Sequence, residues 1–324
     1  MKDHNLGAMK VKPQVSKVAV IGTGVIGASW AAYFLSRGLQ VSASDPAPGA
    51  RDRLLTSVSH LWPTLQRTGL AEGADLGNLS FHDTLEEALR DVEFVQENGP
   101  ERLDLKLDLF ARIDAVLDPD VVIASSSSGL LMSSVQAACT RHPERVVLGH
   151  PFNPPHLIPL VEVIGGERTS AAAIASAMSF YRLIGKRPIN PKKEVKGHIA
   201  NRLQAALWRE AFHLVAIGAA SVADIDDAIA YGPGLRWAVL GPFMNLHFSG
   251  GDGGMRHVLD HLGGPIESWW EDLGSPSLTP ELKTQIVDQM SAALAKIQEK
   301  DVMAARDELI SNLIQAKTGV KVLP

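Results

Sequence analysis

The sequence has a single cysteine, Cys139, among its 324 residues. One thiol cannot form an intrachain disulfide framework or a zinc site built from several thiolates. An isolated cysteine is also typical of a reducing compartment, so we expect a cytoplasmic protein. The eleven histidines show no HExxH or comparable ligand spacing, and the sequence therefore predicts no metal.

Long apolar runs and long basic runs are both missing. The run "VVIASSSSGLLM" at 121–132 is interrupted by four serines and falls short of the roughly 20 residues that span a bilayer. The formal net charge is −5 with charges of both signs interspersed, which argues against nucleic acid or an anionic membrane as partner. Residues 1–15 have basic positions without a following apolar core, so we expect a loose extension rather than a secretory signal.

Alternating patterns predict an α/β fold over residues 16–192. The β-rich run at 17–22 ends in glycine, 25–38 has helical apolar spacing, and 39–45 is again β-rich. This is one βαβ unit, and further strands are predicted at 79–81, 92–98, 121–127, 145–152 and 160–166. Such alternation is typical of a Rossmann-type, doubly wound and mainly parallel sheet.

The pattern changes near residue 192. Residues 193–324 predict an all-helical C-terminal domain for substrate binding and dimerisation, with helices over 198–217, 222–230, 239–248, 253–262 and 280–317. Helices with large apolar faces commonly bury them against a second copy of the same chain. We therefore expect a homodimer.

The segment "IGTGVIG" predicts a dinucleotide site. Gly22 permits the turn after the strand, Gly24 lets the backbone approach a pyrophosphate, and Gly27 lets the helix pack on the strand. The next strand ends in Asp45, at the distance where a carboxylate accepts both hydroxyls of an adenine ribose and repels a 2′-phosphate. NAD is therefore the expected cofactor, with a glycine turn beside a surface aspartate as the alternative.

The segment "GHPFNPPHLIPLVEV" combines a histidine with a glutamate inside an apolar run. Ionised glutamates are rarely buried without a partner, and His150 is the nearest candidate for Glu162. A carboxylate bonded to one imidazole nitrogen fixes the tautomer and stabilises the cation that forms when the other nitrogen takes a proton. Taken alone, a histidine before "PFNP" is more often a structural turn residue than a catalytic one.

These motifs together resemble the L-3-hydroxyacyl-CoA dehydrogenase family of β-hydroxy acid oxidoreductases. The resemblance runs from about residue 16 onward through "GTGVIG" with Asp45, "ENGPERLDLK", "SSSSGL", "GHPFNPP" with "LVEVI", "KEVKGHIANRL" and "DIDDAI" through "GPF". It implies that His150 is the catalytic base, Glu162 its partner, and Ser128 and Asn201 polar groups near the substrate oxygen. It also implies that Glu101 and Lys106 contact the nicotinamide end of NAD.

The chain departs from the coenzyme A users of that family. Those enzymes tend to have lysines after the second strand, whereas residues 49–95 contain none, so a small free hydroxy acid is expected. The segment "YGPGLRWAVLGPF" most resembles the carnitine-oxidising branch, which acts on the 3-hydroxyl of a trimethylammonium acid. In that reading Arg236 meets the carboxylate, and Trp237, with Trp208 as a further candidate, faces the cation. Trp269 and Trp270 are instead typical of core or interface residues.

Other interpretations remain open at this level. Within the class, the lambda-crystallin-like L-gulonate 3-dehydrogenases share the "SSS" and "HPxNPP" features, and an L-3-hydroxyacyl-CoA substrate is a further alternative. In a different class, an intact fold could serve as a non-catalytic NAD(H)-binding structural protein. The joint presence of Ser128, His150, Glu162 and Asn201 argues against that role, because a structural protein has no need of them.

Overall fold

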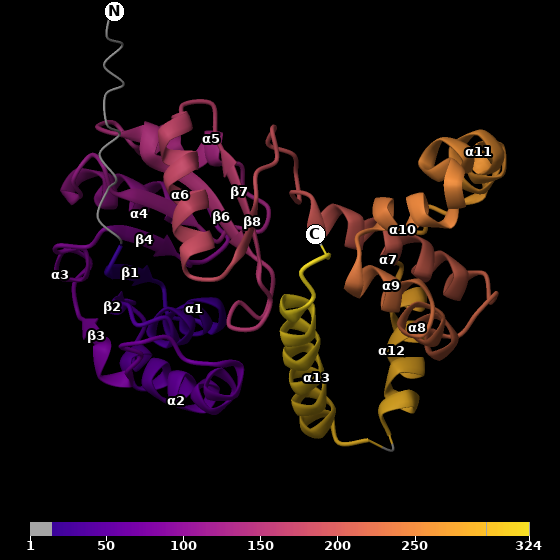
Figure 1. Cartoon of the computed structure of the whole chain (residues 1–324). Helices are drawn as coiled ribbons and strands as arrows, with labels where there is room; N and C mark the ends of the chain where they lie inside the picture. The colour runs from indigo at the N-terminus through magenta and orange to yellow at the C-terminus, as the bar shows by residue number, and fades with distance from the viewer. Residues whose placement is uncertain (1–14, 296, 324) are drawn as a thin grey trace, which may run out of the picture. The chain divides into compact units, whose positions relative to one another are not determined.

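The computed structural model describes residues 15–295 and 297–323, and it divides into two compact units between Ile199 and Ala200 (Figure 1). The expected N-terminal extension, residues 1–15, lies outside the described residues except for Val15.

The first unit is built on one eight-stranded sheet in the order β3-β2-β1-β4-β5-β6-β7-β8. All neighbouring strands are parallel except β6 and β7, which are antiparallel. This order, with β1 at the point where the connections reverse direction, is that of a doubly wound dinucleotide-binding fold. The strands are β1 (Lys17–Ile21), β2 (Gln40–Ser44), β3 (Leu79–His82), β4 (Phe94–Glu97), β5 (Val122–Ser125), β6 (Val146–Pro151), β7 (Leu160–Gly165) and β8 (Arg187–Ile189).

Helices cover both faces of this sheet, which explains why its strands are apolar on both sides. Val18 and Val20 of β1 lie in one buried cluster with residues of α1, α2 and α6, whereas Ala19 and Ile21 lie in the other with residues of α3, α4 and α5. The helices are α1 (Val25–Ser36), α2 (Ala50–Thr68), α3 (Leu85–Ala88), α4 (Leu103–Val116), α5 (Met132–Val135) and α6 (Ala171–Leu183). The predicted α/β class is confirmed.

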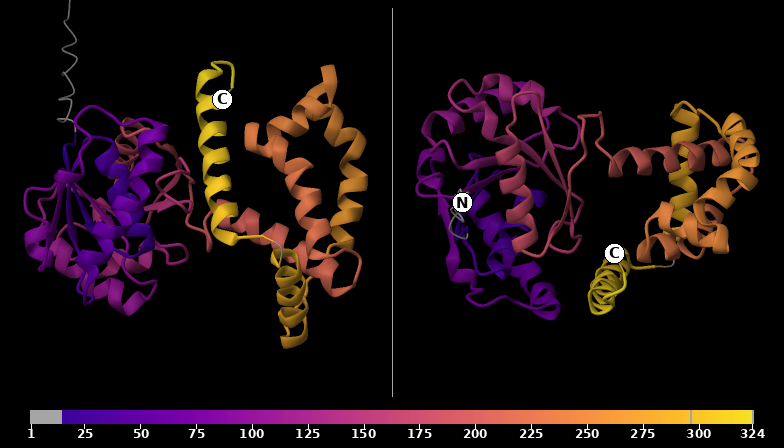
Figure 2. Two further views of the ribbon diagram at one scale, coloured as in Figure 1. Left: turned by 90° about the horizontal axis from the view of Figure 1, so that it is seen from below. Right: turned by 45° about the horizontal axis from the view of Figure 1, so that its top comes forward.

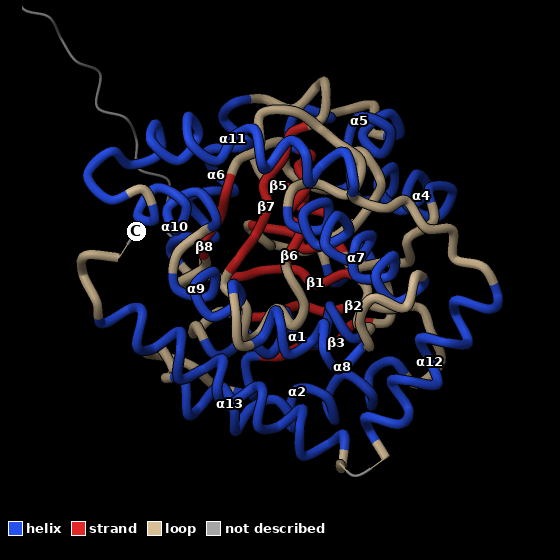
Figure 3. Tube along the Cα trace, turned by 90° about the vertical axis from the view of Figure 1, so that its right-hand side faces the viewer, coloured by secondary structure: helices blue, strands red, loops and turns tan. Residues whose placement is uncertain are grey.

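The second unit is helical in all of its described regular structure (Figure 3). It contains α7 (Ala200–Ala216), α8 (Val222–Ala230), α9 (Pro233–Val239), α10 (Pro242–Ser249), α11 (Gly254–Asp272), α12 (Pro280–Leu294) and α13 (Glu299–Gly319). The predicted helical second half is therefore confirmed, although its boundaries differ in three places.

Two of these differences occur at glycine or proline residues, and the third is an interruption between two helices. Helix α9 was not predicted because "GPG" resembles a loop, yet Pro233 occupies the first helical turn, where its missing N–H costs nothing. Helix α11 continues beyond the expected end at 262 and passes through Pro265. The expected helix over 280–317 is two helices, α12 and α13. In the first unit, the three-residue strand β8 at the sheet edge was also missed, because Pro188 argues against a strand except at an edge.

Helix α13 lies apart from the other helices of the second unit along most of its length (Figure 2). Near its end, Lys317 Nζ donates a hydrogen bond of 2.8 Å to the carbonyl oxygen of Ala238. Its apolar side chains remain exposed, among them Leu309 at 68%. No helix of the described residues is both long enough and apolar enough to cross a membrane.

Candidate active site

The candidate site lies in the first unit at the carboxyl ends of the parallel strands. Strand β1 leads into the glycine turn, β2 into Asp45, β4 into Glu97 and β5 into the serine loop. Ligands of doubly wound sheets bind at this edge, next to the strand where the connections reverse. The structure therefore brings most of the sequence-predicted residues together at the carboxyl ends of the strands of one sheet.

The glycine turn leaves no room for larger residues. Gly22 has φ +84°, and a Cβ atom there would lie 2.8 Å from the backbone of Asn98. A Cβ on Gly27 would lie 1.9 Å from the carbonyl oxygen of Gly22, so helix α1 packs directly against the turn. Gly24 differs, because a Cβ there would meet nothing within 4 Å. The open space at Gly24 is where a ligand can approach the backbone.

Helix α1 offers its N-terminus to that space. No side chain caps it, and Val25 in its first turn is 80% exposed. Uncapped amides and the positive end of the helix dipole together form an anion site that suits a diphosphate. The residues present therefore fit a dinucleotide.

Asp45 lies half-buried at the end of β2. Its Oδ2 accepts hydrogen bonds from Thr23 N at 2.7 Å and Thr23 Oγ1 at 3.2 Å, and its Oδ1 accepts one from Ala47 N at 2.9 Å. These bonds fix the carboxylate beside the glycine turn, as a ribose-binding acid requires.

His150 and Glu162 lie directly opposite each other on the antiparallel strands β6 and β7. Nδ1 of His150 is 2.9 Å from Oε2 of Glu162, and both residues are buried, at 5% and 0% exposure. An ionised carboxylate only accepts hydrogen bonds, so Nδ1 is the donor of this contact, and Nε2 has the free electron pair whenever the ring is neutral. Glu162 also accepts a bond of 2.8 Å at Oε1 from the backbone N of Ile199. The pair therefore has the geometry of a base and its orienting partner.

The strand under His150 is fixed by a buried polar network. Tyr181 Oη donates to Gln96 Oε1 at 2.6 Å, and Gln96 Nε2 donates to the carbonyl oxygen of Gly149 at 3.2 Å. A Cβ on Gly149 would lie 2.1 Å from Tyr181 Oη, so only glycine fits beside the catalytic candidate. Burial raises the pKa of Tyr181 far above its ordinary value, which keeps the hydroxyl protonated as a donor.

Glu101 organises the serine loop after β5. Its Oε1 accepts hydrogen bonds from Ser127 Oγ at 2.6 Å, Gly129 N at 2.8 Å and Leu130 N at 3.2 Å. Desolvation raises the pKa of Glu101, but these bonds and the charge of Lys106 outweigh it and hold the pKa below its ordinary value. The ionised carboxylate thus shapes the loop that presents Ser128, whose side chain is exposed.

Lys106 is buried, at 1% exposure, and its ammonium lies against a glutamate that the sequence argument missed. Nζ is 2.7 Å from Oε1 and 2.9 Å from Oε2 of Glu97, which also accepts a bond of 2.6 Å from Ser125 Oγ. Losing one partner of a buried ion pair commonly costs about 3 to 5 kcal/mol. Lys106 therefore anchors α4 to the ends of β4 and β5, and its contact with nicotinamide stays a prediction.

The remaining sequence-predicted residues belong to the second unit. Asn201 lies in the first turn of α7, whereas Arg236 and Trp237 are neighbours in α9 and both are exposed. Their roles stay predictions.

His198 was also missed by sequence reasoning. It is 2% exposed, and its ring centroid lies 5.1 Å from that of His150. The only sequence signal is the preceding Gly197, with φ +77°, which marks a turn but does not predict which side chain it buries.

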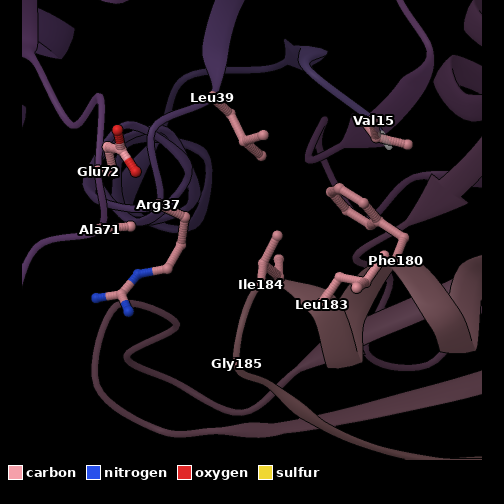
Figure 4. A pocket seen from close by; sticks show the side chains of 9 residues that line it. All are labelled: Val15, Arg37, Leu39, Ala71, Glu72, Phe180, Leu183, Ile184 and Gly185. Carbon is pink, nitrogen blue, oxygen red and sulfur yellow. The ribbon is translucent and has the colours of Figure 1, made fainter. Parts of the chain in front are cut away.

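A cavity of about 480 Å³ opens at the other end of the sheet (Figure 4). Among its lining residues, Val15 and Leu39 precede β1 and β2, and Ile184 follows α6. It therefore lies at the amino ends of the parallel strands, away from the glycine turn and His150, and it is not the candidate active site. No group of three metal-ligating side chains occurs in the described part of the chain.

Comparison with known proteins agrees with this geometry. Residues 17–195 match the family model of the NAD-binding domain of 3-hydroxyacyl-CoA dehydrogenase, and residues 197–289 match that of its C-terminal domain. The chain belongs to the 3-hydroxyacyl-CoA dehydrogenase family. Its first unit is accordingly an NAD-binding domain, and its chemistry is that of an oxidoreductase acting on a CH–OH group.

Several members of the family are similar over nearly the whole chain. The L-carnitine dehydrogenase of Streptomyces coelicolor is 53% identical over 302 residues, which cover 93% of this chain and 95% of that protein. The L-carnitine dehydrogenase of Pseudomonas putida is 46% identical, covering 95% and 96%. The crystal structure of 5-formyl-3-hydroxy-2-methylpyridine 4-carboxylic acid 5-dehydrogenase, an NAD⁺-dependent dismutase, has a TM-score of 0.82 at 31% identity and covers 95% of this chain and 100% of that one.

Proposed function

We propose that this dehydrogenase oxidises the 3-hydroxyl of L-carnitine to the 3-oxo acid with NAD. The observation that carries the proposal is the similarity, at 46 to 53% identity over more than nine tenths of the chain, to dehydrogenases named for L-carnitine. The hydrogen-bonded His150 and Glu162 supply the chemistry that such a reaction needs.

Oxidation of a secondary alcohol removes a proton from the hydroxyl and a hydride from carbon. NAD supplies the hydride acceptor. Nε2 of His150 takes the proton, and Glu162 stabilises the resulting imidazolium while holding the ring in place. Ser128 and Asn201 donate hydrogen bonds to the substrate oxygen as its charge changes, a contribution commonly equivalent to a few kcal/mol of transition-state stabilisation.

The cationic and the anionic group of the substrate are recognised by different residues. A trimethylammonium group cannot donate a hydrogen bond, so it gains mainly from aromatic faces and apolar contact, for which Trp237 is the candidate. Arg236 meets the carboxylate. Asp45 accepts the two ribose hydroxyls of NAD, and Glu101 with Lys106 supports the nicotinamide end.

The test is a panel of L-carnitine, L-gulonate, 3-hydroxybutyrate and its CoA thioester at fixed NAD. We expect the highest kcat/KM for L-carnitine, and we expect Trp237→Ala to raise its KM about tenfold, which is within the range of one desolvated cation–π contact. The matched control is Trp270→Ala, an exposed tryptophan on α11, which should leave that KM unchanged. A higher kcat/KM for L-gulonate or the thioester would contradict the substrate assignment while leaving the dehydrogenase class intact.

We also infer that the protein is a cytoplasmic homodimer. The second unit exposes large apolar side chains on nearly every helix, which favours burial against a second copy. Cys139 is unpaired and buried, and burial raises the pKa of its thiol to about 12, so it acts as a packing residue suited to a reducing compartment.

A further inference from the structure

His198 lies at the end of the first unit, on a turn closed by its backbone N, which donates to the carbonyl oxygen of Val195 at 2.9 Å. It has φ +51°, in the left-handed region that most residues avoid and that histidine visits more often than most. Strained backbone of this kind clusters at functional sites. A histidine held here, buried, is therefore unexpected unless its side chain is used.

The side chain contacts the elements of the candidate site. Its Nε2 is 3.1 Å from the carbonyl oxygen of Ser127, directly before Ser128. Its ring lies beside that of His150, with planes inclined by 51°. The next residue, Ile199, donates its backbone N to Glu162. This one turn thus contacts the serine loop, the catalytic histidine and its orienting glutamate.

These contacts fix the form of the ring. A carbonyl oxygen only accepts, so Nε2 of His198 has the proton, and the neutral ring keeps Nδ1 unprotonated. A second proton would place a cation beside His150, which itself gains a positive charge when it takes the hydroxyl proton. The neutral tautomer is therefore the one compatible with oxidation.

Charged groups on several elements face this ring. Desolvation and the neighbouring His150 on β6 lower the pKa of His198, while the bond to Ser127, Glu162 on β7 and Glu101 after β4 act in the opposite direction. Glu194 lies near His198 in the same linker, and its carboxylate accepts hydrogen bonds from Ser133. The net effect is a pKa below the ordinary value for histidine, so the ring is neutral at neutral pH.

We propose that His198 is a positioning residue of the dehydrogenase reaction: as a neutral Nε2–H imidazole it holds the Ser127 carbonyl, and with it Ser128, against the ring of His150. This inference rests on the proposed roles of His150 and Ser128. His198 itself exchanges no proton with substrate. Its protonation disables the site by adding a cation next to the base.

The first test needs no substrate. Nitrogen-15 NMR of histidine-labelled protein at pH 7 should show His198 as the neutral Nε2–H tautomer, with His198→Phe used to assign its signals. An imidazolium or an Nδ1–H tautomer at pH 7 would overturn the proposal whatever the substrate proves to be.

The second test separates positioning from space filling. His198→Phe keeps a ring but removes the donor, whereas His198→Gln keeps a donor near the position of Nε2. With the best substrate of the panel, we expect His198→Phe to lower kcat about tenfold, with NADH affinity within twofold of the unaltered protein. His198→Gln should recover most of the loss. Full activity of a folded Phe variant, or a Gln variant no better than Phe, contradicts the role.

The pH profile supplies a measurement that space filling would not change. In the unaltered enzyme activity requires a neutral His198, so log kcat/KM should fall more steeply at low pH than in His198→Gln, where that requirement is absent. The control is His60→Gln, an exposed histidine on α2, which should keep the slope of the unaltered enzyme. Equal low-pH slopes in the unaltered enzyme and in His198→Gln overturn the proposal. Absence of turnover in the unaltered enzyme counts instead against the proposed function.

Discussion

The two units bury apolar side chains to very different extents. In the first unit, two clusters fill both faces of the sheet, and large residues such as Trp30, Phe94 and Phe110 are fully buried. In the second unit, the buried hydrophobic residues among those described are Val215, Val258 and Leu282. A domain normally owes its stability to one such core. The first unit therefore contains its own core, and the second needs an additional surface to pack against.

The proposed residues for proton transfer and those for substrate recognition differ in burial in the same way. The candidate proton-transfer pair, His150 and Glu162, is buried in the first unit on two opposing strands. The candidate substrate contacts Arg236 and Trp237 lie on an exposed helix of the second. Substitutions at His150 and Glu162 should therefore act mainly through rate, and those at Arg236 and Trp237 mainly through substrate affinity.

The largest expected effect concerns His150. We expect His150→Ala to lower kcat by about 10²- to 10⁴-fold, the usual contribution of general acid–base catalysis, while NADH affinity stays within twofold. Steady-state kinetics and NADH fluorescence measure the two quantities. His60→Ala on the exposed face of α2 is the control. Normal turnover in His150→Ala would show that the reaction does not depend on the buried pair of the first unit.

Much of the fold could be predicted from the sequence because its local signals agree. Strand β1, the glycine turn, helix α1 and Asp45 follow each other in the order that a dinucleotide fold requires. The elements that were missed lack such agreement. Strand β8 has three residues with a proline, and α9 begins with "GPG", so tertiary context decides both.

The site was predictable only where residue type and spacing constrain each other. Glu162 was expected to need a partner because a lone buried carboxylate is costly, and this argument identified His150 as its nearest candidate. No such argument identifies Glu97 or His198. The burial of Glu97 depends on its contacts with Lys106 of α4 and Ser125 of β5, which only the folded chain brings together. The burial of His198 depends on a turn, and no hydrophobic periodicity in the sequence indicates that this turn is buried.

A matched pair of glycines compares packing in the two units. In the first unit, Gly149→Ala would place a Cβ 2.1 Å from Tyr181 Oη, and we expect a loss of about 2 to 3 kcal/mol in the free energy of unfolding. In the second, Gly263→Ala on α11 meets nothing within 4 Å and should stabilise by about 0.5 to 1 kcal/mol. Urea unfolding measures both, and equal effects would contradict the difference in packing.

One aspartate in each unit allows the pH dependence of stability to be compared between the two units. Asp114 is 1% exposed and accepts hydrogen bonds from Arg141 N at 2.8 Å and Arg145 Nη2 at 2.9 Å. Desolvation raises its pKa, but these donors outweigh desolvation and leave the pKa below the ordinary 3.8. A lowered folded-state pKa stabilises the fold above pH 3.8, and that contribution is lost as the pH falls through the folded value. Asp224, exposed in the second unit, has its pKa lowered by Ser221 in a capping box.

We therefore expect Asp114→Asn to lower the free energy of unfolding by about 2 kcal/mol at pH 7, as for a hydrogen-bonded buried charge. The difference from the unaltered protein should shrink as the pH falls below 3.8 toward the lowered pKa of Asp114, because the carboxyl group then becomes protonated. Asp224→Asn should move the urea midpoint much less at any pH, because water solvates that carboxylate and asparagine also caps helices well. A loss for Asp114→Asn that is independent of pH would show that its charge does not matter.

The smallest expected effect tests whether the exposed face of the second unit is covered by another copy. Leu309 on α13 is 68% exposed and Leu183 on α6 is 65% exposed, so a glutamate at either position has similar access to solvent in the single chain. If α13 packs against a partner, Leu309→Glu buries a charge in the interface and should raise the dimer dissociation constant at least about tenfold, or 1.4 kcal/mol. Leu183→Glu should leave it unchanged. Sedimentation across a concentration series measures both constants, and an unaltered dimer in Leu309→Glu would assign the association to a different helix of the second unit.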